Sequence, residues 1–76
     1  MTTSSKLIDF LGGTFAVANM LGIKPPSVSK WRTEGIPRGR LAELAIQTGR
    51  AVRSLNDLSE NNLHHAWPEL AEQEKV

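Results

Sequence analysis

The sequence contains no cysteine, no tyrosine, and only two phenylalanines and two tryptophans among its 76 residues. Without cysteine, the chain has neither a disulfide framework nor a thiolate zinc site. No apolar run approaches the roughly 20 residues that a membrane-spanning helix needs, and the first residues lack the apolar stretch of a secretory signal. We therefore expect one small domain with a compact core, located in the cytoplasm.

Patterns that catalysis or cofactor binding requires are also missing. The sequence shows no nucleophile and base in a recognisable turn, and no glycine-rich stretch that makes a phosphate-binding loop. His64 and His65 are adjacent, so on a helix their side chains diverge by about 100° and cannot bind one metal ion together. We expect no enzyme activity, no metal or other cofactor, and no small-molecule substrate.

Charge is unevenly distributed along the chain, although the net charge is only +1. Residues 1–53 carry eight basic and three acidic side chains, a net charge of +5. Residues 54–76 carry one basic and five acidic side chains, a net charge of −4. A basic segment of this kind favours a polyanionic partner, although positive charge also serves solubility.

Glycine and proline divide the first 49 residues into four short segments in which apolar residues recur at helical spacing. The predicted helices lie around Leu7–Leu11, Thr14–Leu21, Pro26–Thr33 and Arg38–Thr48. Each is too short to be stable alone, so the helices must pack on one another. The sequence therefore predicts an all-α fold, a small bundle of four to five helices.

Residues 54–76 form an acidic C-terminal tail in which the helical signal is weaker. Serine and asparagine residues in this tail are poor helix formers, but a fifth helix is expected over residues 59–67, ended near Pro68. Trp67 belongs either to the core of the tail or to a dimer contact. Arg50 and Arg53 either extend the basic surface or meet the acidic side chains of the tail.

Residues 14–33 have the spacing of two helices joined by a sharp turn. Ala18 is small where a second helix must cross closely, and Gly22 stands four residues later, where the turn needs a positive φ. The residues expected to face inward after the turn are Ile23, Val28 and Trp31. This spacing predicts a helix-turn-helix motif, the centre of a DNA-binding domain over residues 1–53.

The helical wheel places polar side chains on the outward face of the second helix of the motif. The outward residues are Pro26, Ser29, Lys30 and Thr33, with Ser27 and Arg32 on the flanks. Because this face carries no large apolar residue, it suits a major groove about 12 Å wide. Ser29 and Lys30 offer groups that hydrogen-bond to base edges, whereas the ring of Pro26 suits a thymine methyl group.

From Ile8 to Gly49 the chain resembles the Cro repressors of lambdoid phages and the related YdaS-type regulators. The matching residues are Ala16-Val17-Ala18, Leu21-Gly22-Ile23, Val28-Ser29-Lys30-Trp31, and Gly35-Ile36-Pro37 with Arg40. These elements are specific in this order and spacing, whereas any one alone is a weak signal. The resemblance implies a lambda repressor-like fold and a phage-encoded repressor that acts as a homodimer on a short, partly palindromic operator in double-stranded DNA.

The resemblance also implies particular DNA contacts, which the helical wheel extends. Base contacts are implied for Pro26, Ser29 and Lys30, and the outward face adds Thr33. Phosphate contacts are implied for Thr14 and Ser27, and the basic residues add Lys24, Arg32, Arg38 and Arg40. For Arg40, an ion pair with Glu43 three residues along the helix is an equal alternative.

Three features depart from the family pattern. Thr14 stands where the family commonly has a longer polar residue such as glutamine, so its contact with the DNA backbone would be shorter. Lys24 stands where a polar cap is common, and lysine cannot cap a helix N-terminus. The Pro25-Pro26 pair removes polar readers from the leading end of the recognition helix.

Two other kinds of function stay open from the sequence alone. An antitoxin or a YdaS-type regulator would use the same fold on other promoters. A protein-interaction module would dock a basic partner on the acidic tail, but such a module should expose aromatic or aliphatic anchors, which the outward face lacks. RNA binding is less favoured, because no aromatic stacking platform is evident and Trp31 lies at a core position.

Overall fold

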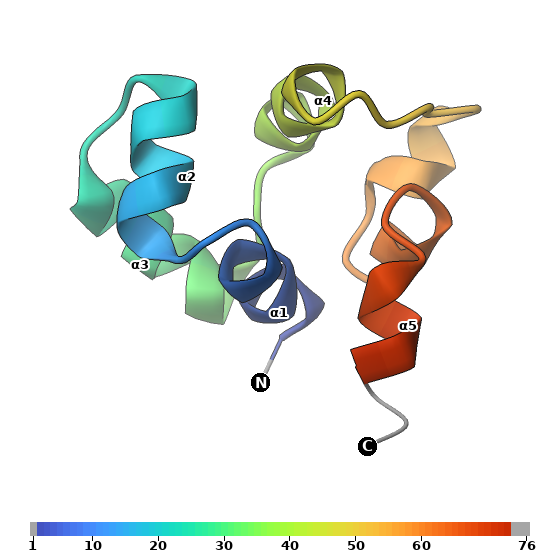
Figure 1. Cartoon of the computed structure of the whole chain (residues 1–76), viewed down its shortest axis with the longest axis horizontal. Coiled ribbons are helices and arrows are strands. Elements are labelled where there is room, and N and C mark those ends of the chain that lie inside the picture. The colour runs from blue at the N-terminus through green and yellow to red at the C-terminus, as the bar shows by residue number, and fades with distance from the viewer. Residues whose placement is uncertain (1, 74–76) are drawn as a thin grey trace.

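A computed structural model of the chain describes residues 2–73, without the side chains of residues 55, 72 and 73. The α-helices are α1 (Thr3–Phe10), α2 (Thr14–Leu21), α3 (Pro25–Glu34), α4 (Arg38–Gln47) and α5 (Glu69–Gln73), and the 3-10 helices are η1 (Leu55–Leu58) and η2 (Leu63–His65). The described residues contain no strand (Figure 1), which confirms the expected all-α class.

Local chemistry accounts for the ends of the helices. The Thr2 side chain caps α1 by accepting a hydrogen bond from the Ser5 N–H. Helix α3 begins at Pro25, one residue earlier than expected, with Pro26 as its second residue. Neither proline has an N–H, and the first helical positions have no intrahelical partner for one, so both residues are tolerated there.

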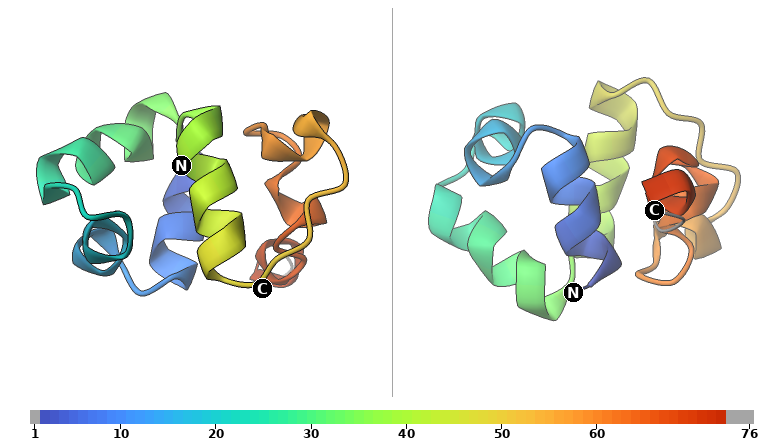
Figure 2. Two further views of the ribbon diagram at one scale, coloured as in Figure 1. Left: turned by 90° about the horizontal axis from the view of Figure 1, so that it is seen from above. Right: turned by 60° about the horizontal axis from the view of Figure 1, so that its bottom comes forward.

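Helices α1 and α4 stand in the middle of the molecule and separate two groups of elements. Helices α2 and α3 pack on one side, against α1 and α4 (Figures 1 and 2). The tail elements η1, η2 and α5 pack on the other side, where α5 and η2 contact α1 and η1 contacts α4. The motif and the tail therefore share the same two central helices.

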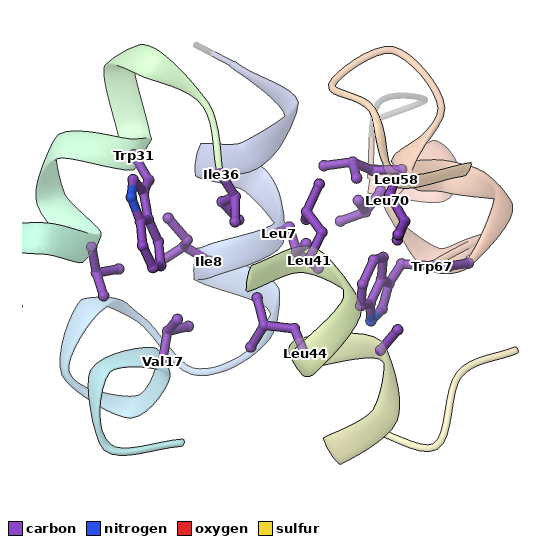
Figure 3. Packing of buried hydrophobic residues seen from close by; sticks show 14 of the residues in the cluster. Leu7, Ile8, Val17, Trp31, Ile36, Leu41, Leu44, Leu58, Trp67 and Leu70 are labelled. Atoms are coloured by element: carbon purple, nitrogen blue, oxygen red, sulfur yellow. The ribbon is translucent and has the colours of Figure 1, made fainter. Parts of the chain in front are cut away.

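The hydrophobic core follows this arrangement (Figure 3). Trp31 of α3 lies beside Ile8 of α1 on the motif side. Trp67 is fully buried on the tail side, close to Leu41 and Leu44 of α4. Of the two roles open for Trp67, the structure shows the core role, because a side chain with no exposed surface has none to offer to a second copy.

The tail differs from the helix expected over residues 59–67. The chain turns between Ser59 and Asn62, forms the short η2, and starts α5 directly after Pro68. Pro68 therefore precedes a helix instead of ending one, which agrees with the preference of proline for helix starts. Asparagine at positions 61 and 62 has a low helix propensity, which favours the turn.

A partly buried set of hydrogen bonds around Glu60, the Glu60 clamp, joins this turn to the rest of the fold. The Glu60 carboxylate accepts hydrogen bonds from the backbone N–H of Ser4, at 2.9 Å, and from the Ser4 hydroxyl. The Ser4 hydroxyl oxygen in turn accepts from the Ile36 N–H at 3.0 Å. One serine with no exposed surface thus links the tail, α1 and the connection between α3 and α4.

Candidate nucleic-acid interface

The turn between α2 and α3 has the geometry that its sequence predicts. Gly22 adopts a left-handed conformation with φ of 68°. The Ile23 N–H donates to the Ala18 carbonyl oxygen at 2.9 Å, which closes the end of α2. Ala18 itself is 1% exposed, so its small side chain permits the close packing of α2 and α3. Residues 14–33 therefore form a helix-turn-helix.

Helix α3 presents the predicted faces. Val28 is fully buried and Trp31 is 9% exposed, so Trp31 packs in the core. The side chains on the opposite face are exposed, and they are Pro26, Ser29, Lys30 and Thr33. The structure thus gathers all four candidate base contacts on one accessible face of one helix.

Two of these side chains interact within α3. Lys30 Nζ lies 3.7 Å from Glu34 Oε2, and both side chains are more than half exposed. A pair of this kind contributes little to stability, so the ammonium group remains available to another partner. The Thr33 hydroxyl donates to the Lys30 carbonyl oxygen at 3.1 Å and keeps its own oxygen as an acceptor.

The candidate phosphate contacts fall into two groups. Lys24, Ser27 and Arg38 are exposed at the starts of α3 and α4, whereas Thr14, Arg32 and Arg40 are partly buried. Arg40 Nη1 lies 3.1 Å from Glu43 Oε1, so the ion pair considered for Arg40 is present. The pair leaves 38% of the Arg40 side chain exposed.

Arg32 is held from several sides at once. Its Nε donates to Thr14 Oγ1 at 3.0 Å, its Nη1 to Ser5 Oγ at 3.0 Å, and its Nη2 to Asp9 Oδ1 at 2.8 Å. Its carbonyl oxygen accepts a hydrogen bond from the Thr2 hydroxyl at 2.8 Å. Two of the candidate phosphate contacts, Thr14 and Arg32, are therefore bonded to each other.

Sequence reasoning missed the polar partners that hold the motif, namely Ser4, Ser5, Asp9 and Glu60. A signal existed for Ser4, because it stands three and four residues before Leu7 and Ile8 and so shares their buried face. Asp9 and Glu60 lie far along the chain from the groups that they bind, and a single sequence carries no signal for such contacts.

The tail side carries its own ion pairs. Arg50 binds Glu69 through two nitrogen–oxygen contacts, so of the two roles open for Arg50 it takes the one that meets the acidic tail. The hydrogen bond from Arg50 lowers the pKa of Glu69 below its usual value. The hydrogen bond from His65 Nδ1, at 2.9 Å, is the main cause that lowers the pKa of Asp57, helped by the backbone N–H of Arg53.

Asp57 and His65 line a surface groove of about 580 Å³ between the end of α4 and the tail. Among the residues that the structure describes, no three histidine or acidic side chains come together as a metal site would require. None of the described helices is long and apolar enough to span a membrane.

The chain matches a family model described as DNA-binding transcriptional regulator Cro over residues 3–62. The match covers α1 to α4, including the whole helix-turn-helix. The chain is a member of this Cro family. It matches no curated protein and no solved structure significantly. Membership agrees with the resemblance seen in the sequence, and it makes this Cro-family chain a DNA-binding regulator of phage Cro type, a class of protein that is not an enzyme class.

Proposed function

We propose that this Cro-family protein is a sequence-specific transcriptional repressor whose helix α3 enters the major groove of a short palindromic operator. The observation that carries the proposal is the exposed polar face of α3, which the buried Val28 and Trp31 fix in orientation. A short helix with small polar side chains and one lysine fits the width of a major groove, which admits an α-helix.

The side chains of this face suit direct readout of bases. Lys30 reaches O6 and N7 of guanine, and Ser29 either donates to or accepts from a base edge. Pro26 at the leading end contacts a thymine methyl, and Thr33 lies one turn further along the same face. Because few side chains here carry specific polar groups, direct readout depends mainly on Lys30 and Ser29.

Phosphate contacts position the helix on the duplex. The exposed Lys24, Ser27 and Arg38 lie at the N-terminal ends of α3 and α4, where the positive end of the helix dipole also favours an anion. Thr14, the first residue of α2, and the partly exposed Arg40 complete this set. Such contacts add affinity for any sequence and make it depend on salt.

A dimer would satisfy the geometry of a palindromic site. Half-sites one helical turn apart separate two recognition helices by roughly 34 Å. The described part of one copy spans 28 Å along its longest principal axis, so two copies side by side would cover both half-sites. Because Trp67 has no exposed surface in the single chain, we expect the dimer contact to lie elsewhere. Among the described residues, the large apolar side chains that remain exposed for a second copy are Phe15, Ile46 and Val52.

The main alternative is an antitoxin or YdaS-type regulator that uses the same fold on another promoter. The Cro-family match favours a DNA-binding role over a protein-interaction module, and so does the absence of a large apolar side chain from the outward face of α3. A phage or prophage repressor would act in the cytoplasm of the bacterial host cell.

Selection from a random pool of DNA duplexes at near-physiological salt tests the proposal, followed by a salt titration of the selected sequence. A short consensus with twofold symmetry and a steep salt dependence is the expected result. A steep salt dependence without a consensus would indicate a nonspecific DNA binder instead. Retention of no duplex would overturn the repressor function.

A further inference from the structure

Among the residues of α3, Arg32 bonds to helix α1, to the residue that caps α1, and to the start of α2. Its guanidinium reaches Ser5 and Asp9 in α1 and Thr14 at the start of α2. Its backbone oxygen accepts a hydrogen bond from Thr2, the cap of α1. These partners are 18 to 30 residues away in the chain, so one residue of the recognition helix fixes its position against two other helices.

The geometry leaves Arg32 less suited to a phosphate than the other basic residues. A guanidinium has five N–H donors in a rigid fork, and here three of them serve protein oxygens. The Asp9 carboxylate, whose Oδ1 lies 2.8 Å from Arg32 Nη2, neutralises the positive charge of the guanidinium. Only 27% of the Arg32 side chain is exposed. By contrast, Lys24 and Arg38 are exposed.

The same network prepares Thr14 for its proposed phosphate contact. Thr14 Oγ1 accepts from Arg32 Nε, which uses an oxygen lone pair and leaves the hydroxyl hydrogen for another acceptor. Thr14 is the first residue of α2, where a helix N-terminus favours an anion. The arginine therefore orients a neutral donor and does not itself supply charge to the DNA backbone.

We propose that Arg32 is a positioning residue for operator recognition. It holds α3 at a fixed orientation to α1 and α2, so that Ser29 and Lys30 meet base edges at the same time as Thr14 meets a phosphate. This inference rests on the proposed function, because it concerns how the same surface discriminates between sequences. A positioning role and a direct phosphate contact by Arg32 make different predictions. They differ in how the loss of Arg32 changes the salt dependence of binding and the preference for the operator.

The first experiment replaces Arg32 by lysine and measures binding to the selected operator and to an unrelated duplex over a range of salt. Lysine keeps the charge but cannot bond three oxygens in a fork. We expect operator binding to weaken about tenfold or more, with little change for the unrelated duplex and no change in the salt slope. Arg53→Lys, a control exchange at an exposed arginine between α4 and η1, should leave both affinities near those of the parent.

A double variant, Asp9→Asn with Arg32→Gln, removes both charges and so keeps the net charge of the pair. The positioning role predicts loss of operator preference with an unchanged salt slope. If Arg32 instead bound a phosphate, both duplexes would be bound more weakly and the slope would fall by about one unit. That result, or an Arg32→Lys protein that discriminates as the parent does, would overturn the inference.

Amide hydrogen exchange in the DNA-free protein separates this inference from the proposed function. The positioning role predicts faster exchange in the last turn of α3 in Arg32→Lys than in the parent, with little change in the tail elements. Unchanged exchange would overturn the positioning role. A parent protein that prefers no duplex would overturn the proposed function, whatever the exchange data show.

Discussion

Lys30 is the side chain on which sequence discrimination should depend most. It extends from the outward face of α3 with 71% of its side chain exposed, and its partner Glu34 is 59% exposed. Such an exposed pair costs little to break, because water screens it. Lys30 is therefore able to break its ion pair with Glu34 and form a hydrogen bond to a base edge without loss of fold stability.

We predict that Lys30→Ala weakens operator binding by about 1–3 kcal/mol and relaxes the preference at one base pair. The physical reason is the loss of a charged donor to guanine without a change in the buried face of the helix. Competition binding with a set of single-base operator variants measures both effects.

Arg53→Ala provides the matched control for Lys30, since Arg53 is an exposed basic residue between α4 and η1, away from α3. It should keep the base preference of the parent. If Lys30→Ala discriminated among the operator variants as well as Arg53→Ala does, the outward face of α3 would not be the reading surface.

At the scale of elements, the sequence predicts the motif better than the tail. Apolar spacing and the positions of glycine and proline place α2 to α4 and the end of α1 within one residue, because these signals act over one or two helical turns. Helix α1 begins at Thr3, four residues before the expected Leu7, because the Thr2 side chain caps it there. The inward face of α3 follows from the same periodicity. The tail folds through contacts with distant residues, such as Glu60 with Ser4 and Glu69 with Arg50, and local periodicity does not predict these contacts.

The Glu60 clamp should make the tail a structural part of the DNA-binding domain. We predict that Glu60→Ala lowers the free energy of unfolding by about 2 kcal/mol, because it leaves the buried N–H and hydroxyl of Ser4 without their charged acceptor. Glu43→Ala, which removes only the exposed pair with Arg40, should cost at most about 0.5 kcal/mol. Urea denaturation of the two variants and the parent measures the difference, and equal losses would contradict the clamp.

At the scale of the whole molecule, helix α3 and the tail elements lie on opposite sides of the central helices α1 and α4. The α3 side carries Lys24, Lys30 and Arg38, whereas two acidic residues of the tail, Glu69 and Glu60, bind Arg50 and Ser4. The described part of the tail, up to Gln73, therefore lies on the side away from α3, as Figure 1 shows for α5 and α3. We expect this separation to keep the carboxylates of the tail away from DNA bound at α3.

The lowered pKa values of two carboxylates in the tail predict how the stability of the fold responds to low pH. Asp57 and Glu69 have pKa values lowered from 3.8 and 4.5, so they stay ionised in the folded chain at a pH where the unfolded chain takes up protons. Their contribution to stability is complete above the unfolded pKa values and is lost as the pH falls through the lower folded ones. We predict that the free energy of unfolding declines as the pH falls below about 4.5.

Denaturant unfolding between pH 6 and pH 2.5 measures this decline. A variant with Asp57→Asn and Glu69→Gln should be less stable near neutral pH and should lose less stability over the acidic range. A variant that declines as steeply as the parent would show that other carboxylates cause the acid dependence.

The most direct test of the account is a titration of isotope-labelled protein with the selected duplex, followed by backbone amide chemical shifts. We predict that the largest changes fall on α3 from Ser27 to Thr33 and on the first turn of α2, with small changes in η1, η2 and α5. Changes centred on the tail elements, with α3 unaffected, would contradict the claim that α3 is the DNA-reading helix.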